Sequence, residues 1–141
     1  MVPFLYNSPH EVRPEHDVDW TLHADRNIEL KRREERNKLI MDELLAGKDV
    51  VYRSSGWSLY PRVHSNDLCH YAPIRCDDDV EEDDVVFCQV RDMFFAHLVK
   101  RKEWYGYPDN KYSYTISRLD GRENGWTTID KIYGKLVGVW H

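Results

Sequence analysis

Val85-Val86-Phe87-Cys88 and Phe94-Phe95-Ala96-His97-Leu98-Val99-Lys100-Arg101 lie in the middle of the chain and have the composition of β-strands. Both runs are rich in β-branched and aromatic residues, which fit the half-buried surface of a sheet. Side chains alternate between the two faces of a strand, so Lys100 falls at the end of an apolar row that starts at Phe94. Arg101 falls on the opposite face with His97, and its guanidinium stays protonated and cannot act as a base.

Four further runs on either side of these two have the same character: residues 50–52, 68–71, 112–116 and 132–139. Turn-forming pairs separate some of them, at Asp109-Asn110 and Asp120-Gly121. Six short strands separated by turns predict a mainly β body with a barrel or sandwich-like arrangement.

The region before the strands predicts one charged helix. From about Asp19 to Ala46 it carries opposite charges at i,i+4 spacing, and Gly47 is placed to end the helix. The stretch 31–38 has no apolar residue, so we expect it to be solvated rather than to face a polar partner. Residues 1–18 contain three prolines and predict an extended arm. The expected organisation is therefore an arm (1–18), a helix (19–47) and a β domain (48–141).

Composition limits the classes of function. With 141 residues and 41% hydrophobic content the chain is expected to build one core. A net charge of −5 without a basic stripe argues against nucleic-acid binding. No apolar run approaches the roughly 18 residues of a membrane span, and no secretory signal is visible. We therefore expect a soluble, cytoplasmic protein whose arm and helix are available for a protein partner or for oligomerisation.

The three cysteines favour reduced thiols, because their number is odd and their spacing is unlike a disulfide framework. Cys69, His70 and Cys76 offer metal-ligating groups, but no Cys-x-x-Cys pair accompanies them. The sequence therefore predicts no metal site, and no cofactor.

A serine between turn residues is the main candidate for chemistry. Ser58 follows Gly56 and Trp57 just after the first predicted strand, where backbone N–H groups can converge on a developing oxyanion. A serine hydroxyl needs a base to become a nucleophile. A lysine can serve only when burial lowers its pKa from about 10.4. Lys100, at the end of an apolar row, is placed for such burial.

Four segments in order resemble the LexA-like (S24) serine peptidases, which are related to signal peptidases. The first is the nucleophile segment Ser55-Gly56-Trp57-Ser58-Leu59-Tyr60-Pro61, followed by Asn66-Asp67-Leu68. The others are residues 80–86, Leu98-Val99-Lys100-Arg101 and residues 132–139. Together they extend from about Asp49 to Val139. The resemblance implies a LexA/signal-peptidase-like β-barrel-like body.

The resemblance also implies roles for individual residues. Ser58 would be the nucleophile and Lys100 the general base, with the backbone N–H groups of Trp57 and Ser58 as the oxyanion hole. Supporting positions would be Ser55, Gly56, Leu59, Pro61 and Asp67. Asn66 and Asp83 stand where the family has turn glycines, and Asn and Asp best accept a left-handed backbone. Trp57 is bulkier than the family's usual residue.

Two functions of different classes remain at this stage. The first is a serine endopeptidase with a Ser-Lys dyad that cuts a peptide bond in itself or in a dedicated partner. The second is a catalytically silent fold of the same family, used as a binding or structural module in a larger assembly, for example a viral one. Repressor-type self-cleavage at Ala46-Gly47 is disfavoured, because Gly47 is explained as a helix stop. Retention of both Ser58 and Lys100 favours the enzyme.

Overall fold

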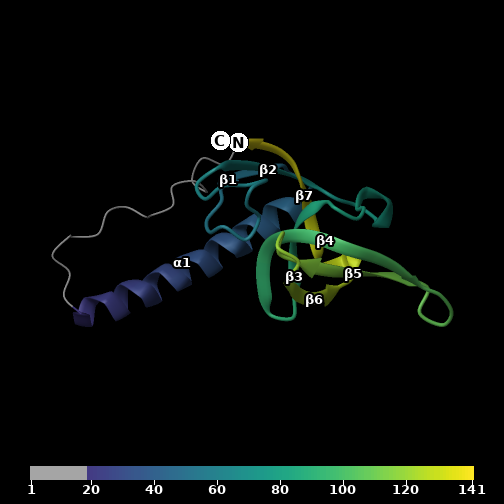
Figure 1. Cartoon of the computed structure of the whole chain (residues 1–141), viewed down its shortest axis with the longest axis horizontal. Helices are drawn as coiled ribbons and strands as arrows, with labels where there is room; N and C mark the ends of the chain where they lie inside the picture. The colour runs from purple at the N-terminus through teal and green to yellow at the C-terminus, as the bar shows by residue number, and fades with distance from the viewer. Residues whose placement is uncertain (1–18) are drawn as a thin grey trace.

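The computed structural model describes the backbone of residues 19–141 and the side chains from Arg26 onward; the predicted arm over residues 1–18 lies outside the described residues. The described part is mainly β, as predicted, and consists of one helix and an antiparallel seven-stranded sheet that curls into a half-barrel (Figure 1). The sheet order is β1-β2-β7-β3-β4-β5-β6. In chain order the elements are α1 (Asp19–Leu45), β1 (Val50–Arg53), β2 (Leu68–Pro73), the 3-10 turn η2 (Asp77–Asp79), β3 (Val85–Val90), β4 (Met93–Tyr105), β5 (Lys111–Ser117), β6 (Glu123–Thr127), the 3-10 turn η3 (Ile129–Lys131) and β7 (Ile132–Trp140).

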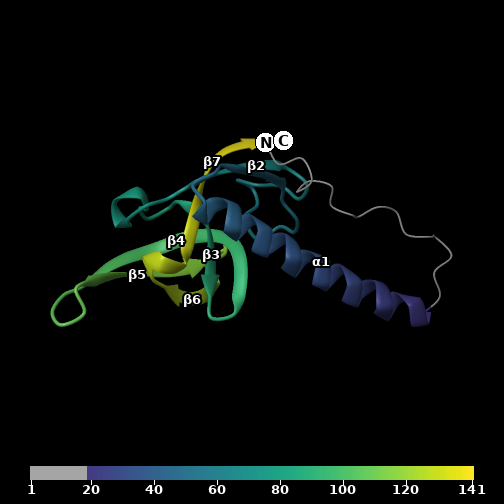
Figure 2. The ribbon, with the colours of Figure 1, turned by 180° about the vertical axis from the view of Figure 1, so that it is seen from behind.

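Helix α1 lies against the body with its C-terminal half, and its N-terminal half extends away from the sheet in both views (Figures 1 and 2). Ile40 and Leu44 are buried against the sheet. Gly47 has φ +83°, and its N–H donates to the carbonyl of Leu44, which confirms it as the helix stop. Among residues 19–141 no helix combines the length and the apolar character that crossing a bilayer requires.

The stretch 31–38 is only in part the solvated face that we expected. Residues 31–35 and Lys38 are exposed, but Arg36 and Asn37 are half-buried. Arg36 lies over the ring of Tyr52 at the start of the sheet, 5.3 Å from its centroid. A charged run thus contributes two polar side chains to the interface between helix and sheet.

Two groups of apolar side chains form the core. The first lies between α1 and strands β1, β2 and β3, with Ile40, Tyr71 and Phe87 among its members. The second lies on the other side of β3, with Val86, Val99 and Tyr114. Strand β3 therefore contributes to both groups, which explains why four of its residues in succession are buried.

All six predicted strands are present, and β6 is the one that sequence reasoning missed. Its sequence, Glu-Asn-Gly-Trp-Thr, contains an Asn-Gly pair typical of a turn. Pairing with β5 holds this segment extended despite its composition, for example at Thr115 opposite Trp126. The turns predicted at Asp109-Asn110 and Asp120-Gly121 lie between strands as expected.

Both non-glycine turn positions take the left-handed backbone that we predicted for them. Asn66 has φ 76° and Asp83 has φ 79°. The Asp83 turn is joined to β4, because the N–H of Asp83 donates to the carbonyl of Val99 and the N–H of Val99 donates to the carbonyl of Asp84, each at 2.8 Å. The turn thereby supports β4 beside a break in its pairing with β5.

That break is a bulge between Val99 and Arg101. A bulge sets two residues of one strand against one of its partner and redirects the side chains that follow. The apolar row that starts at Phe94 therefore ends at Leu98, and Lys100 does not continue it. Lys100 is exposed, which corrects the prediction of a desolvated lysine.

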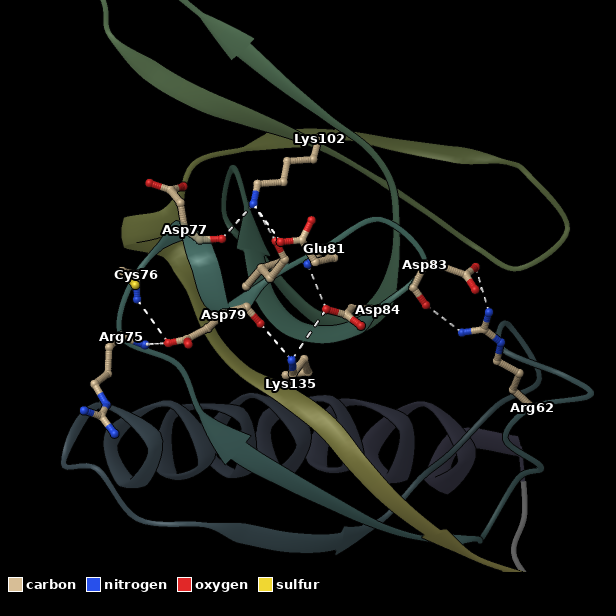
Figure 3. Close-up of polar contacts among 11 residues, drawn as sticks. Arg62, Arg75, Cys76, Asp77, Asp79, Glu81, Asp83, Asp84, Lys102 and Lys135 are labelled. Atoms are coloured by element: carbon tan, nitrogen blue, oxygen red, sulfur yellow. Dashed lines mark hydrogen bonds and ion pairs between the residues drawn. The ribbon is translucent and has the colours of Figure 1, made fainter.

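An acidic loop before β3 is held by basic side chains from distant segments (Figure 3). Lys102 donates to the carbonyls of Asp77 and Val80, each at 2.8 Å. Lys135 donates to the carbonyl of Asp79 and lies 3.8 Å from a carboxylate oxygen of Asp84. These contacts fix the loop that carries the Asp83 turn.

Candidate active site

Ser58 lies in the loop between β1 and β2, and this loop is anchored to the body by buried side chains and by a backbone hydrogen bond. Leu59 and Val63 are buried in the first core group. The carbonyl of Ser58 accepts a hydrogen bond from the N–H of Leu119 at 2.9 Å. The loop is therefore tied both to the core and to the β5–β6 connection, and Ser58 itself is half-buried.

The Ser58 hydroxyl is paired with a histidine. Oγ of Ser58 lies 3.0 Å from Nε2 of His97 on β4. Nδ1 of the same ring lies 2.7 Å from Oδ1 of Asn124 on β6. An amide oxygen only accepts, so Nδ1 carries the hydrogen and donates to Asn124. Nε2 is then free of hydrogen and accepts from the Ser58 hydroxyl.

This order of groups is that of an activated nucleophile, with a hydroxyl, a base and a residue that orients the base. A Ser-His-Asn arrangement uses the same logic as the Cys-His-Asn groups of papain-like enzymes. Three segments distant in sequence bring the groups together: the β1–β2 loop, β4 and β6. The arrangement can generate a nucleophilic oxygen without a metal or cofactor.

The protonation state of His97 suits a base. Burial lowers the pKa of His97 below its usual 6.5, against an opposing contribution from the hydrogen bond with Asn124. The positive charge of Arg118 lowers the pKa further, and Asp120 raises it. A net lowering keeps the imidazole neutral, and able to accept a proton, at neutral pH.

Lys100, the base predicted from sequence, has different partners. Its Nζ lies 3.0 Å from Oε2 of Glu123 and 3.3 Å from the carbonyl oxygen of Gly121. Arg101 contacts the same Glu123 carboxylate oxygen at 3.3 Å. Lys100, in the bulge, and Arg101, just after it, therefore both face Glu123, and the structure gives no hydrogen bond between Lys100 and Ser58.

The predicted oxyanion-hole residues lie beside the nucleophile. Among the hydrogen bonds within residues 19–141, none uses the backbone N–H of Trp57 or of Ser58 as donor. Within this part of the chain neither N–H group is therefore committed to a partner. Trp57 itself is 60% exposed, and its ring packs edge-on against Tyr60 at 5.5 Å. The bulky side chain points into solvent and does not fill the core.

The predicted supporting residues have structural positions around the loop. Ser55 and Gly56 line a cavity next to Ser58, and Gly56 has φ +83°. Pro61 is exposed and follows a cis peptide bond. Leu59, as described above, anchors the loop in the core.

Asp67 stabilises the C-terminal end of the same loop through hydrogen bonds to its carboxylate. It is only 5% exposed, and its Oδ2 accepts hydrogen bonds from the N–H of His64 and from Nδ1 of His141, each at 2.7 Å. Desolvation raises the pKa of Asp67, but these hydrogen bonds outweigh it and lower the pKa overall. Asp67 therefore accepts as a carboxylate and fixes the end of the loop.

The side chains of His64, Asp67 and His141 form the one group of three metal-ligating residues that lies together within the described part of the chain, with ligand atoms within 4.8 Å of one another. The carboxylate in this group already accepts two hydrogen bonds. Cys69 and Cys88 are buried free thiols and Cys76 is exposed. Burial raises the pKa of Cys69 to about 11, which makes it a poor nucleophile.

A cavity of about 140 Å³ opens beside the Ser58–His97 pair. Its lining includes the apolar side chains of Leu59, Val63 and Phe94, together with residues of helix α1. This volume holds several water molecules, and so it accommodates a side chain of a bound molecule. Ser58 thus lies in the lining of a partly enclosed site.

Sequence reasoning missed His97 and Asn124. His97 was within a predicted strand, but alternation placed it on the face opposite to Lys100, away from the row that suggested desolvation. Asn124 belongs to β6, the strand that had no recognisable pattern. A histidine in a buried strand three residues before the predicted base was the one available signal.

Comparisons of the chain with models of protein families, with curated proteins and with solved structures gave no match.

Proposed function

We propose that this protein is a serine hydrolase in which Ser58 is the nucleophile, His97 the general base and Asn124 the residue that orients it. The observation that carries the proposal is the pair of hydrogen bonds at His97, 3.0 Å to Ser58 and 2.7 Å to Asn124. The sequence resemblance to LexA-like peptidases adds the substrate class, a peptide bond in the chain itself or in a dedicated partner. The proposal moves the role of base from Lys100 to His97.

In the first half of the reaction Ser58 Oγ attacks the carbonyl carbon while its proton passes to Nε2 of His97. The C–O bond forms, and the carbonyl oxygen becomes an oxyanion beside the N–H groups of Trp57 and Ser58. The imidazolium then gives the proton to the leaving nitrogen. The C–N bond breaks, and the acyl group remains on Ser58.

In the second half a water molecule attacks the acyl carbon. His97 again accepts the proton, now from water, and returns it to Ser58 Oγ as the ester bond breaks. The products are a free carboxylic acid and an amine. Throughout, Asn124 holds Nδ1 protonated and the ring in place.

Labelling with a fluorophosphonate tests the proposal, because such reagents react with activated serines. We expect labelling at Ser58, none in Ser58→Ala, and a rate roughly 100-fold or more lower in His97→Ala. Lys100→Met is the matched control on the same strand and should react at close to the wild-type rate. Mass spectrometry of the protein incubated alone would detect cleavage of the chain itself.

Two other outcomes would contradict the proposal. Loss of labelling in Lys100→Met with retention in His97→Ala would assign the base to Lys100 and overturn the role of His97. A wild-type protein that neither reacts nor cuts peptides would favour the second hypothesis, a silent fold that serves as a binding or structural module.

A further inference from the structure

The cavity beside Ser58 is electropositive on the side formed by helix α1. Arg33, Arg36 and Asn37 contribute to its lining together with the Ser58 loop and His97. Among the residues that the structure describes, the lining includes two arginines and no acidic residue. Charged side chains in a partly enclosed, partly apolar site normally have a partner of opposite sign.

Arg36 lacks such a partner in the described part of the chain. Its Nε is buried and has no hydrogen-bonding partner there, and its guanidinium lies over the ring of Tyr52 at 5.3 Å. An unsatisfied buried N–H is costly, more so on a charged group. The contact with the Tyr52 ring supplies no acceptor in the plane of the guanidinium for its Nε–H group.

Electrostatics around Arg36 point the same way. Burial lowers the pKa of Arg36, the neighbouring Tyr52 raises it, and the positive charge of Arg33 lowers it. The guanidinium nevertheless remains charged, because its pKa is far above neutrality. The two positive charges at one cavity repel each other. A bound anion would offset this repulsion and would supply the hydrogen-bond acceptor that Nε of Arg36 lacks.

We propose that this cavity binds the carboxylate side chain of an aspartate or glutamate in the peptide that Ser58 cleaves. The inference rests on the proposed function, since it names the substrate class for the same site. The planar guanidinium of Arg36 matches a carboxylate in bidentate geometry. The apolar wall at Leu59 and Phe94 accommodates the methylene groups that connect a carboxylate to the peptide backbone.

The position of the cavity decides which residue of the substrate would carry the carboxylate. Ser58 and His97 line the same small cavity as Arg33 and Arg36 of helix α1. A side chain that reaches the helix from a carbonyl at Ser58 belongs to a residue next to the scissile bond. The enzyme would therefore cut beside an acidic residue.

Peptidyl diphenyl phosphonates test this inference, because they react with the serine and carry a chosen side chain. One probe carries a glutamate side chain and the other a glutamine side chain. The wild type should react about 10- to 100-fold faster with the glutamate probe, as expected for a hydrogen-bonded charge. In Arg36→Met the ratio should fall towards one. Arg32→Met, an exposed arginine outside the cavity, should keep the wild-type ratio.

A fluorophosphonate without a side chain separates this inference from the proposed function. If it labels Ser58 while the wild type does not distinguish the two phosphonates, the acidic preference is wrong and the hydrolase stands. If it labels nothing, the proposed function is wrong. Arg36→Lys serves if Arg36→Met does not fold, and it should lower the ratio without abolishing it.

Binding provides a readout that needs no chemistry. Glutarate should perturb the NMR signals of the Tyr52 and Phe94 rings in the wild type, and glutaramide should not. Both residues line the cavity. Equal perturbation by the two compounds, or an unchanged response to glutarate in Arg36→Met, would overturn the carboxylate site.

Discussion

His97 and Lys100 lie three positions apart on strand β4, yet only His97 contacts Ser58. Lys100 lies in the bulge between Val99 and Arg101, where the pairing of β4 with β5 is interrupted. Before the bulge, His97 bonds Ser58 at 3.0 Å. Within it, Lys100 bonds Glu123 at 3.0 Å. The extra residue of the strand is thus Lys100 itself, and its amine pairs with a carboxylate and not with the serine.

We expect the reactivity of Ser58 to rise with pH through the pKa of His97 and to level off at neutral pH. Burial, the largest contribution, lowers that pKa below 6.5, and only the neutral ring accepts the serine proton. Asn124→Asp should raise the pKa, because a carboxylate favours the imidazolium, and move the rise to higher pH. Fluorophosphonate labelling rates between about pH 4 and 11 measure both curves and cover the range in which a lysine titrates. A rise shared by both proteins only above about pH 9 would instead indicate a lysine base.

Asn66→Ala should destabilise the protein by about 1 kcal/mol, whereas Asn66→Gly should leave stability nearly unchanged. The reason is the left-handed backbone at φ 76°, which alanine adopts at a cost and glycine does not. Urea denaturation of the two variants gives the comparison. Equal losses in both would show that the side chain, rather than the backbone angle, stabilises the turn.

Lys102→Met should cost roughly 2–4 kcal/mol of unfolding free energy. The side chain is only 10% exposed, and its removal leaves the carbonyls of Asp77 and Val80 without this donor. Lys48→Met is the control, since its side chain is 68% exposed and forms a surface ion pair with Glu43. We expect the control to change stability by less than about 1 kcal/mol. Thermal and urea unfolding would contradict the role of Lys102 if the two variants matched.

Gly134→Ala should destabilise the packing of α1 on β7 by about 1–3 kcal/mol. A Cβ at Gly134 would lie 2.8 Å from Cδ2 of Leu44 and 3.0 Å from the carbonyl oxygen of Ala72. At Gly138 a Cβ would meet only side-chain atoms, the nearest being on the Trp140 ring at 3.1 Å, and that exposed ring can move. Gly138→Ala is therefore the matched control. Circular dichroism during denaturation would detect the difference, and similar midpoints would argue against close helix packing.

Local patterns predicted the elements that depend on local chemistry. The helix and its stop at Gly47, six of seven strands, and the left-handed backbone at Asn66 and Asp83 all follow from the composition of short segments. Strand β6 was missed because its extended form comes from pairing with β5. Its own residues, Asn124 and Gly125, favour a turn.

The sequence alone predicted a serine nucleophile at Ser58, with Lys100 as its base and the backbone N–H groups of Trp57 and Ser58 as an oxyanion hole. It could not predict the partner of the Ser58 hydroxyl, because strict alternation carries through a strand only where pairing is regular. Tertiary structure decided that partner: Lys100 lies in the bulge and bonds Glu123, whereas His97 bonds Ser58 and Asn124. It also placed Arg36 beside the same cavity, since the docking angle of a helix depends on packing that no local pattern records.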